Sequence, residues 1–214
     1  MANYIQDTEE FVEKNEKLID IWGRKSPKFE KKYQNSVLEV LSDYGKGATE
    51  LTSARGKLLG AGYEVYIMAF FIGLYSGKKL PLSENTEDVK TLGHPIGKWG
   101  NIDKGKNDDS YRSTSKLGRK SYPKLRFYIF TALVAKTDID WIAVDKGEMK
   151  ISSAVAKLFE TMEEYANYGF AYMEEKLKED KGFFFSPRAF LDIFLQLTGK
   201  QHSFVDEDDN PEEL

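Results

Sequence analysis

The stretch SAVAKLFETMEEYANYGFAYMEEKLK, residues 153–178, decides the fold. Its apolar side chains recur every three or four positions for roughly seven turns, which is the period of one face of an α-helix. These positions are Val155, Leu158, Phe159, Met162, Tyr165, Ala166, Gly169, Tyr172 and Met173. Ser152 or Ser153 can cap the start of this helix, and Gly182 stops it. The pattern predicts one long amphipathic helix whose apolar face must be buried against other elements.

A second stretch, VYIMAFFIGLY at 65–75, is apolar nearly all round. A helix of this kind is buried on every side, so we expect a central helix over 63–76 with the long helix packed alongside it. Gly60 and Gly62 predict a break before it, because an interior glycine destabilises a helix by about 0.5–1 kcal/mol relative to alanine. The apolar run is much shorter than the roughly 20 residues that cross a bilayer, which argues against a membrane span.

Shorter apolar stripes predict further helices on both sides of this pair. One begins near Asp7, one follows Ser26-Pro27 and ends at Gly45-Lys46-Gly47, one runs from Ser83 to Gly93, one begins at Pro123 and one at Ser186-Pro187. Residues 139–144 fit a short strand as well as a helical turn. We therefore expect an all-α fold, with a single domain of six or seven helices over residues 1–200 and a long basic Gly-rich loop at 90–126. The acidic tail, 201–214, is expected to be disordered.

The chain contains no cysteine. This excludes disulfide bridges, thiolate zinc sites and cysteine nucleophiles, and it fits a cytoplasmic protein. The first sixteen residues are acidic and polar, so they lack the basic and then apolar pattern of a secretory signal. We expect a cytoplasmic location and no membrane partner.

Charge is distributed unevenly along the chain. Residues 90–126 carry ten Lys and Arg against three Asp, a net charge of +7, whereas residues 1–89 carry −2 and residues 127–214 carry −9. Aromatic residues are interleaved with the cations of the central block. Cations that neutralise phosphates, together with rings that stack on bases, are the components of a nucleic-acid-binding surface. The candidate nucleic-acid-binding residues are Lys98, Trp99, Lys104, Lys106, Arg112, Lys116, Arg119 and Lys120.

Other interpretations fit the same composition. A polar, charged loop is most often simply solvated. A basic loop can also bind an acidic protein partner, in which case the chain is a helical protein–protein adaptor. We rank a non-catalytic polyanion-binding protein, with DNA or RNA as the polyanion, narrowly ahead of the adaptor.

Motifs for catalysis, cofactors and metals are weak in this sequence. Residues 100–107, GNIDKGKN, resemble a phosphate-binding loop but have Asn107 in place of Ser or Thr and lack the flanking strand and helix. Neither His94 nor His202 has a Glu three residues before it, which excludes the paired Glu-x-x-His motif of di-iron bundles. We expect no cofactor and no metal, we identify no catalytic residue, and we place a small enzyme centred on His94 third.

Overall fold

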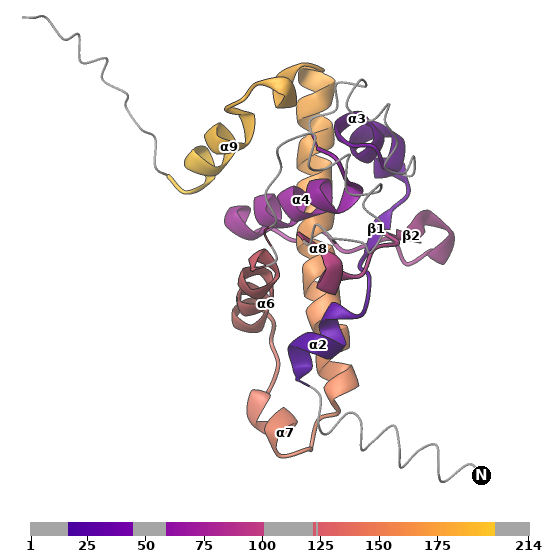
Figure 1. Ribbon diagram of the computed structural model, residues 1–214, viewed down its shortest axis with the longest axis vertical. Coiled ribbons are helices and arrows are strands. Elements are labelled where there is room, and N and C mark those ends of the chain that lie inside the picture. The colour runs from indigo at the N-terminus through magenta and orange to yellow at the C-terminus, as the bar shows by residue number, and fades with distance from the viewer. Residues whose placement is uncertain (1–16, 45–58, 101–121, 123, 200–214) are drawn as a thin grey trace, which may run out of the picture.

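The computed structural model describes residues 17–44, 59–100, 122 and 124–199. Within them the chain is predominantly helical, as the apolar stripes predict. The longest element, α8 (Ile151–Glu179), runs along most of the structure, and α4 (Gly62–Ser76) crosses it near the middle (Figure 1). The predicted central helix over 63–76 and long helix over 153–178 are thus confirmed to within two residues at each end.

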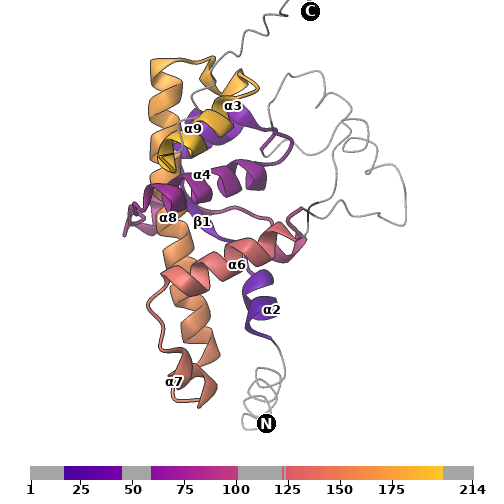
Figure 2. The ribbon, with the colours of Figure 1, turned by 90° about the vertical axis from the view of Figure 1, so that its left-hand side faces the viewer.

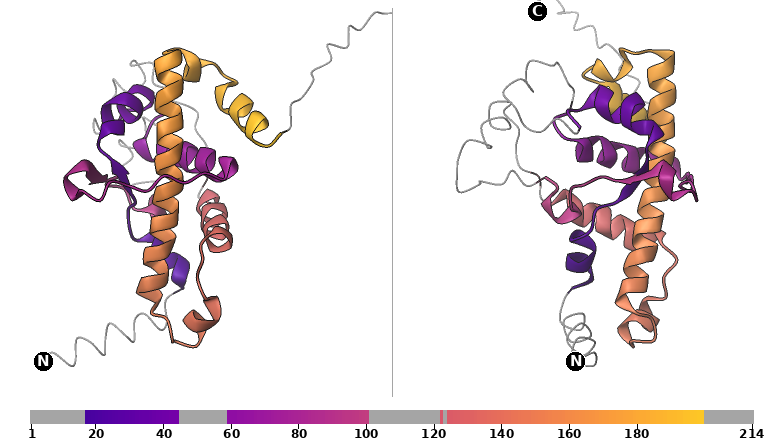
Figure 3. Two further views of the ribbon diagram at one scale, coloured as in Figure 1. Left: turned by 180° about the vertical axis from the view of Figure 1, so that it is seen from behind. Right: turned by 90° about the vertical axis from the view of Figure 1, so that its right-hand side faces the viewer.

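The shorter helices lie largely on one side of α8 (Figures 2 and 3). They are α2 (Leu18–Gly23), α3 (Glu39–Leu41), α6 (Leu125–Lys136), α7 (Trp141–Asp145) and α9 (Ala189–Leu197). Single helical turns connect them: a π-helical turn η1 (Gln34–Leu38), and 3-10 turns η3 (Thr86–Asp88), η4 (Ile96–Lys98) and η5 (Phe183–Phe185). Among the described residues, no helix is both long enough and apolar enough to cross a membrane.

Helices α4 and α8 approach each other so closely that their backbones touch at two glycines. A Cβ atom added to Gly73 would lie 2.0 Å from the carbonyl oxygen of Tyr165. One added to Gly169 would lie 1.8 Å from the carbonyl oxygen of Ala69. Any side chain at these two positions would therefore force the helices apart.

The core around this crossing is aromatic. Phe170 of α8 is fully buried and packs against the rings of Phe29, Tyr33 and Tyr66, with ring centroids 6.3, 5.5 and 5.7 Å away. The rings of such pairs attract each other beyond the area that they bury. Phe170 thus joins α8 to α4 and to the segment that precedes η1.

A small antiparallel sheet lies beside the helices. Strand β1 (Lys28–Glu30) pairs with β2 (Val89–Thr91), and Phe29 lies opposite Lys90. Phe29 and Glu30 are buried, whereas β2 faces solvent along most of its length. The fold is therefore helical with one two-stranded addition that the apolar stripes do not predict.

The predicted helix start at Ser26-Pro27 was wrong. The backbone N–H of Lys28 donates to the Glu163 side chain at 2.8 Å instead of entering a helix, and the chain then pairs as β1. Helical structure begins only at Lys32, and the π-helical turn η1 follows from Gln34. The backbone is extended here because partners distant in sequence provide its hydrogen bonds, which overrides the local helical preference.

The predicted helix between Ser83 and Gly93 was also wrong. Helical structure there is limited to the three residues of η3, where the Asn85 side chain accepts a hydrogen bond from the Glu87 N–H at 3.1 Å. The next residues form β2. A capping side chain stabilises only a single turn when the residues that follow it have no apolar face to pack against the core.

Residues 139–144, which fit either a strand or a helical turn, are helical from Trp141, where helix α7 begins. The Asp140 side chain caps it by accepting hydrogen bonds from the N–H groups of Ile142 and Ala143, both at 3.0 Å. The break predicted at Gly60–Gly62 is confirmed, because α4 begins at Gly62. The predicted helix start near Asp7, the turn at 45–47, the tail 201–214 and most of the basic loop lie outside the described residues.

Candidate functional site

The described residues on either side of the basic segment 101–121 are joined to each other. The Tyr122 backbone N–H donates to the Gly100 carbonyl oxygen at 2.8 Å. Gly100 has φ +71°, and a Cβ atom there would lie 2.6–2.8 Å from Tyr122. Gly100 is thus required twice, for its left-handed backbone and for the close approach. We call the Gly100–Tyr122 pair the neck of the basic segment.

Glu64, in the first turn of α4, holds the neck against the helix. Its Oε1 accepts a hydrogen bond from the Tyr122 hydroxyl at 2.9 Å, and its Oε2 accepts from the N–H groups of Gly60 and Ala61 at 2.8 and 3.1 Å. Burial, together with the negative charge of Glu64, raises the pKa of Tyr122 well above its usual value. The phenol therefore stays protonated and remains a hydrogen-bond donor.

Two of the predicted nucleic-acid-binding residues fall within the described part of the chain, and they lie in different environments. Lys98 is exposed at the end of η4, next to the neck. Trp99 is 2% exposed, its indole N–H donates to the His94 carbonyl oxygen at 3.0 Å, and its ring stacks on Tyr63. Trp99 is therefore a core residue, and its ring is not available to stack on a base. The other predicted contacts, Lys104, Lys106, Arg112, Lys116, Arg119 and Lys120, lie outside the described residues.

A local signal distinguishes Trp99 from an interface ring. Ile96 lies three residues before it, and both side chains are buried. Apolar residues three apart on a helical turn share a face, so this spacing indicates core packing more than stacking on a ligand.

Sequence reasoning missed the two exposed rings at the other end of the basic segment. Phe127 and Tyr128 of α6 are 49% and 68% exposed. They lie in the apolar run LRFYIF, residues 125–130, in which every ring is a candidate for the core. Packing distinguishes these two exposed rings from the core residues of the same run. Ile129 is 1% exposed, and Phe130 contacts the buried ring of Trp22.

His94, the proposed centre of an enzyme, is exposed and stacks on Tyr63, with ring centroids 5.3 Å apart. This stacking packs the imidazole ring against a side chain of α4. In the described ranges, no three acidic or histidine side chains gather as a metal-binding set.

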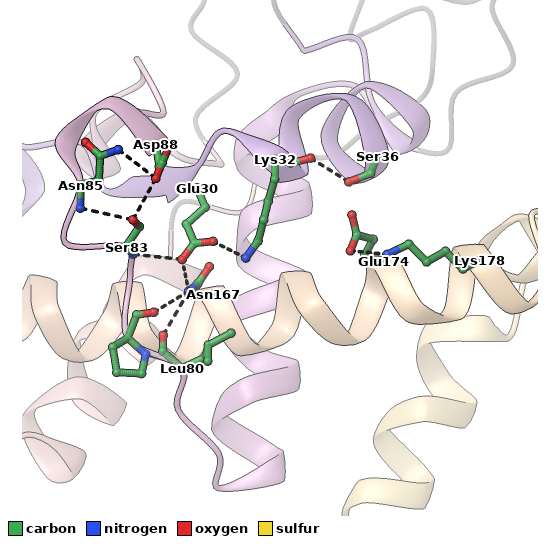
Figure 4. Close-up of polar contacts among 11 residues, drawn as sticks. Glu30, Lys32, Ser36, Leu80, Ser83, Asn85, Asp88, Asn167, Glu174 and Lys178 are labelled. Carbon is green, nitrogen blue, oxygen red and sulfur yellow. Dashed lines mark hydrogen bonds and ion pairs between the residues drawn. The ribbon is translucent and has the colours of Figure 1, made fainter.

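A cavity of about 440 Å³ lies between α8, the residues that precede β1 and the segment that precedes η3. Its lining residues are Lys25, Ser26, Lys28, Pro81, Leu82, Ala156, Phe159, Glu160, Glu163 and Glu164. A buried polar network shares Pro81 with this lining. The Asn167 side-chain amide donates to Glu30 Oε1 and to the carbonyl oxygens of Leu80 and Pro81, at 3.0, 3.3 and 2.9 Å (Figure 4). Glu30 also accepts from the Ser83 N–H at 3.0 Å.

Glu163 in this cavity should make stability depend on pH. Burial raises the pKa of its carboxyl, the Lys28 N–H lowers it, and the charge of Glu160 raises it again. The folded state therefore binds this proton more tightly than the unfolded state does, so the contribution of Glu163 to stability is greatest in acid and declines as the pH rises through its folded pKa.

We therefore expect Glu163→Gln to raise the melting temperature at neutral pH relative to the parent chain, and expect the difference to shrink in acid. Gln can still accept the bond from the Lys28 N–H. Calorimetric scans at neutral and acid pH measure this, with the exposed Glu175→Gln as a control. A difference that grows in acid would contradict the assignment.

Comparisons with protein-family models, with curated proteins and with solved structures find no match to this chain.

Proposed function

We propose that this protein binds nucleic acid through its basic segment. The observation that carries the proposal is the neck. The Tyr122 N–H donates to the Gly100 carbonyl oxygen at 2.8 Å, so the two ends of the basic segment lie side by side. In the sequence, six cations fall between these two ends.

Charge supports the polyanion as the ligand. Residues 101–121 carry six Lys and Arg against three Asp. Lys98 and Lys124, the nearest described lysines on the two sides, are both exposed. A cluster of cations that neutralises phosphates releases the counterions condensed on a nucleic acid, and this release favours binding at low salt. The chain as a whole carries −4, so binding depends on the segment and not on net charge.

Salt dependence tests the proposal. Affinity for a short single strand and for a duplex is expected to fall as salt rises, and replacing Arg112, Lys116, Arg119 and Lys120 together with Gln should weaken binding and flatten the slope. Each lost contact changes the slope of log K against log[salt] by about 0.7 for single strands and 0.9 for duplex. The four substitutions therefore remove up to about 2.8 units of slope for single strands and about 3.6 for duplex. Fluorescence anisotropy at several salt concentrations gives both slopes.

A matched variant controls for net charge. Lys136, Lys146, Lys150 and Lys181 are exposed lysines of α6, α7 and the two ends of α8. Replacing all four with Gln removes the same charge and should leave the slope almost unchanged. Equal salt slopes for the parent chain and for the variant at Arg112, Lys116, Arg119 and Lys120 would refute the proposal. The adaptor is supported instead if the parent chain binds no nucleic acid near physiological salt but binds an acidic protein, and the variant at Arg112, Lys116, Arg119 and Lys120 loses that protein.

A further inference from the structure

Helix α6 exposes an aromatic face directly after the neck. Lys124, Phe127, Tyr128 and Thr131 are all exposed, and their spacing of three, four and seven residues places them on one side of the helix. The opposite side is buried, with Ile129 at 1% and Leu133 at 0% exposed. Adjacent exposed apolar side chains are a feature of surfaces that bind another molecule.

A cation contacts the first of these two rings. The guanidinium carbon of Arg126 lies 5.3 Å from the centre of the Phe127 ring, and its Nη1 donates to the Gly97 carbonyl oxygen at 2.6 Å. This bond fixes the side chain and links α6 to η4, where the exposed Lys98 lies. Arg126 contacts Phe127, and the exposed Lys98 and Lys124 lie, respectively, next to Gly97 and two residues before Arg126 in the chain. The positive charge near the face therefore matches an anionic ligand that also carries flat apolar groups.

A hollow extends the face toward α2. Its volume is about 230 Å³, and Phe127, Arg126, Arg24, Asp20 and Trp22 contribute to its lining. This is below the roughly 300–1,000 Å³ of sites that enclose a whole small molecule. The hollow has room for a single ring system, with an aromatic wall on one side and guanidinium groups at its edge.

We propose that this α6 face binds the unpaired bases of a single-stranded nucleic acid, with Phe127 and Tyr128 as the stacking rings. Bases of a duplex are stacked on one another, whereas those of a single strand are free to stack on protein rings. Arg126 and Lys124 neutralise the phosphates beside the stacked bases. The inference rests on the proposed function and names its ligand, and it moves the stacking role from the buried Trp99 to two exposed rings.

Two strands of equal length separate stacking from charge: an oligothymidylate and an abasic strand that keeps the phosphates and lacks the bases. Phe127→Ala and Tyr128→Ala are each expected to weaken binding of the oligothymidylate by about 5- to 150-fold, the effect of losing one base–ring stack. Binding of the abasic strand should stay within about twofold of the parent chain. Tyr128→Trp should bind the oligothymidylate about as tightly as the parent chain does, because it keeps a stacking ring.

Ile142→Ala serves as the matched control, since Ile142 is a 67% exposed apolar residue of α7, and it should change neither affinity. Equal losses on both strands, or no loss on either, would overturn the stacking inference while leaving the proposed function standing. If the parent chain binds neither strand at low salt, the proposed function fails and the inference fails with it. Loss of self-association in Tyr128→Ala, with unchanged strand binding, would assign the face to a second copy of the chain.

Discussion

Gly73→Ala and Gly169→Ala are each expected to destabilise the fold by more than about 3 kcal/mol, the upper end of the usual effect of overpacking a core. The added methyl group would lie about 2 Å from a backbone carbonyl oxygen of the facing helix. A side chain can rotate away from such a contact, but a helix backbone cannot. Relief therefore requires α4 and α8 to separate, and their separation exposes the aromatic core around Phe170. The expected fall in Tm is more than about 6 °C for a chain of this size.

Gly182→Ala is the control for this prediction. Gly182 has φ −87°, and its nearest contact to an added Cβ atom is the Asp180 side chain at 3.2 Å. Alanine should be tolerated there with a small change in Tm. Thermal unfolding followed by circular dichroism compares the three variants. Similar small changes for all three would show that the two helices do not cross backbone against backbone.

Asn167→Asp is expected to destabilise the protein by about 3–5 kcal/mol at neutral pH, the usual effect of leaving a buried charge without a partner. The substitution keeps the shape of the side chain and replaces a donor with an acceptor. The Asn167 amide nitrogen faces three oxygens, those of Glu30, Leu80 and Pro81. A carboxylate oxygen in its place would face a second carboxylate and two carbonyl groups, with no proton among the four.

Acid should reverse part of this effect. Protonation of the new carboxyl group gives it one donor and removes its charge, so the deficit in unfolding free energy should shrink as the pH falls. Chemical denaturation at neutral and mildly acid pH measures it. Asn35→Asp, at an exposed position of η1, adds the same charge and should alter stability little. If Asn167→Asp is as stable as the parent chain at neutral pH, the network does not hold the segment that precedes η3.

The sequence predicts the parts of this fold that depend on local periodicity. Helix α8 shows its buried face in the spacing of its own apolar residues, and α4 shows its burial by being apolar on every side. Strand β1 could not be predicted, because its partner, β2, lies about sixty residues away and its first N–H bonds to Glu163 of α8. A three-residue strand carries too little pattern to compete with a proline that favours a helix start.

The sequence locates the positive charge of the candidate site, but it does not tell which aromatic rings near that charge are exposed. A count of Lys and Arg finds the basic segment, since charge is a property of composition. Which rings face solvent depends on the packing of the helix that carries them. Trp99 and Tyr128 are both aromatic residues near cations, yet Trp99 is 2% and Tyr128 is 68% exposed.

The neck also has a consequence for how this chain can vary. Gly100 and Tyr122 hold the two ends of the segment together, and the bond from the Tyr122 hydroxyl to Glu64 ties these ends to α4. None of these bonds depends on the number of residues between the two ends. Lengthening a closed loop is thermodynamically inexpensive, at about 0.6 kcal/mol for each doubling. We therefore expect insertions, deletions and exchanges between these two residues to leave the bonds among Gly100, Tyr122 and Glu64 in place, so that this part of the chain can vary while the neck stays constant.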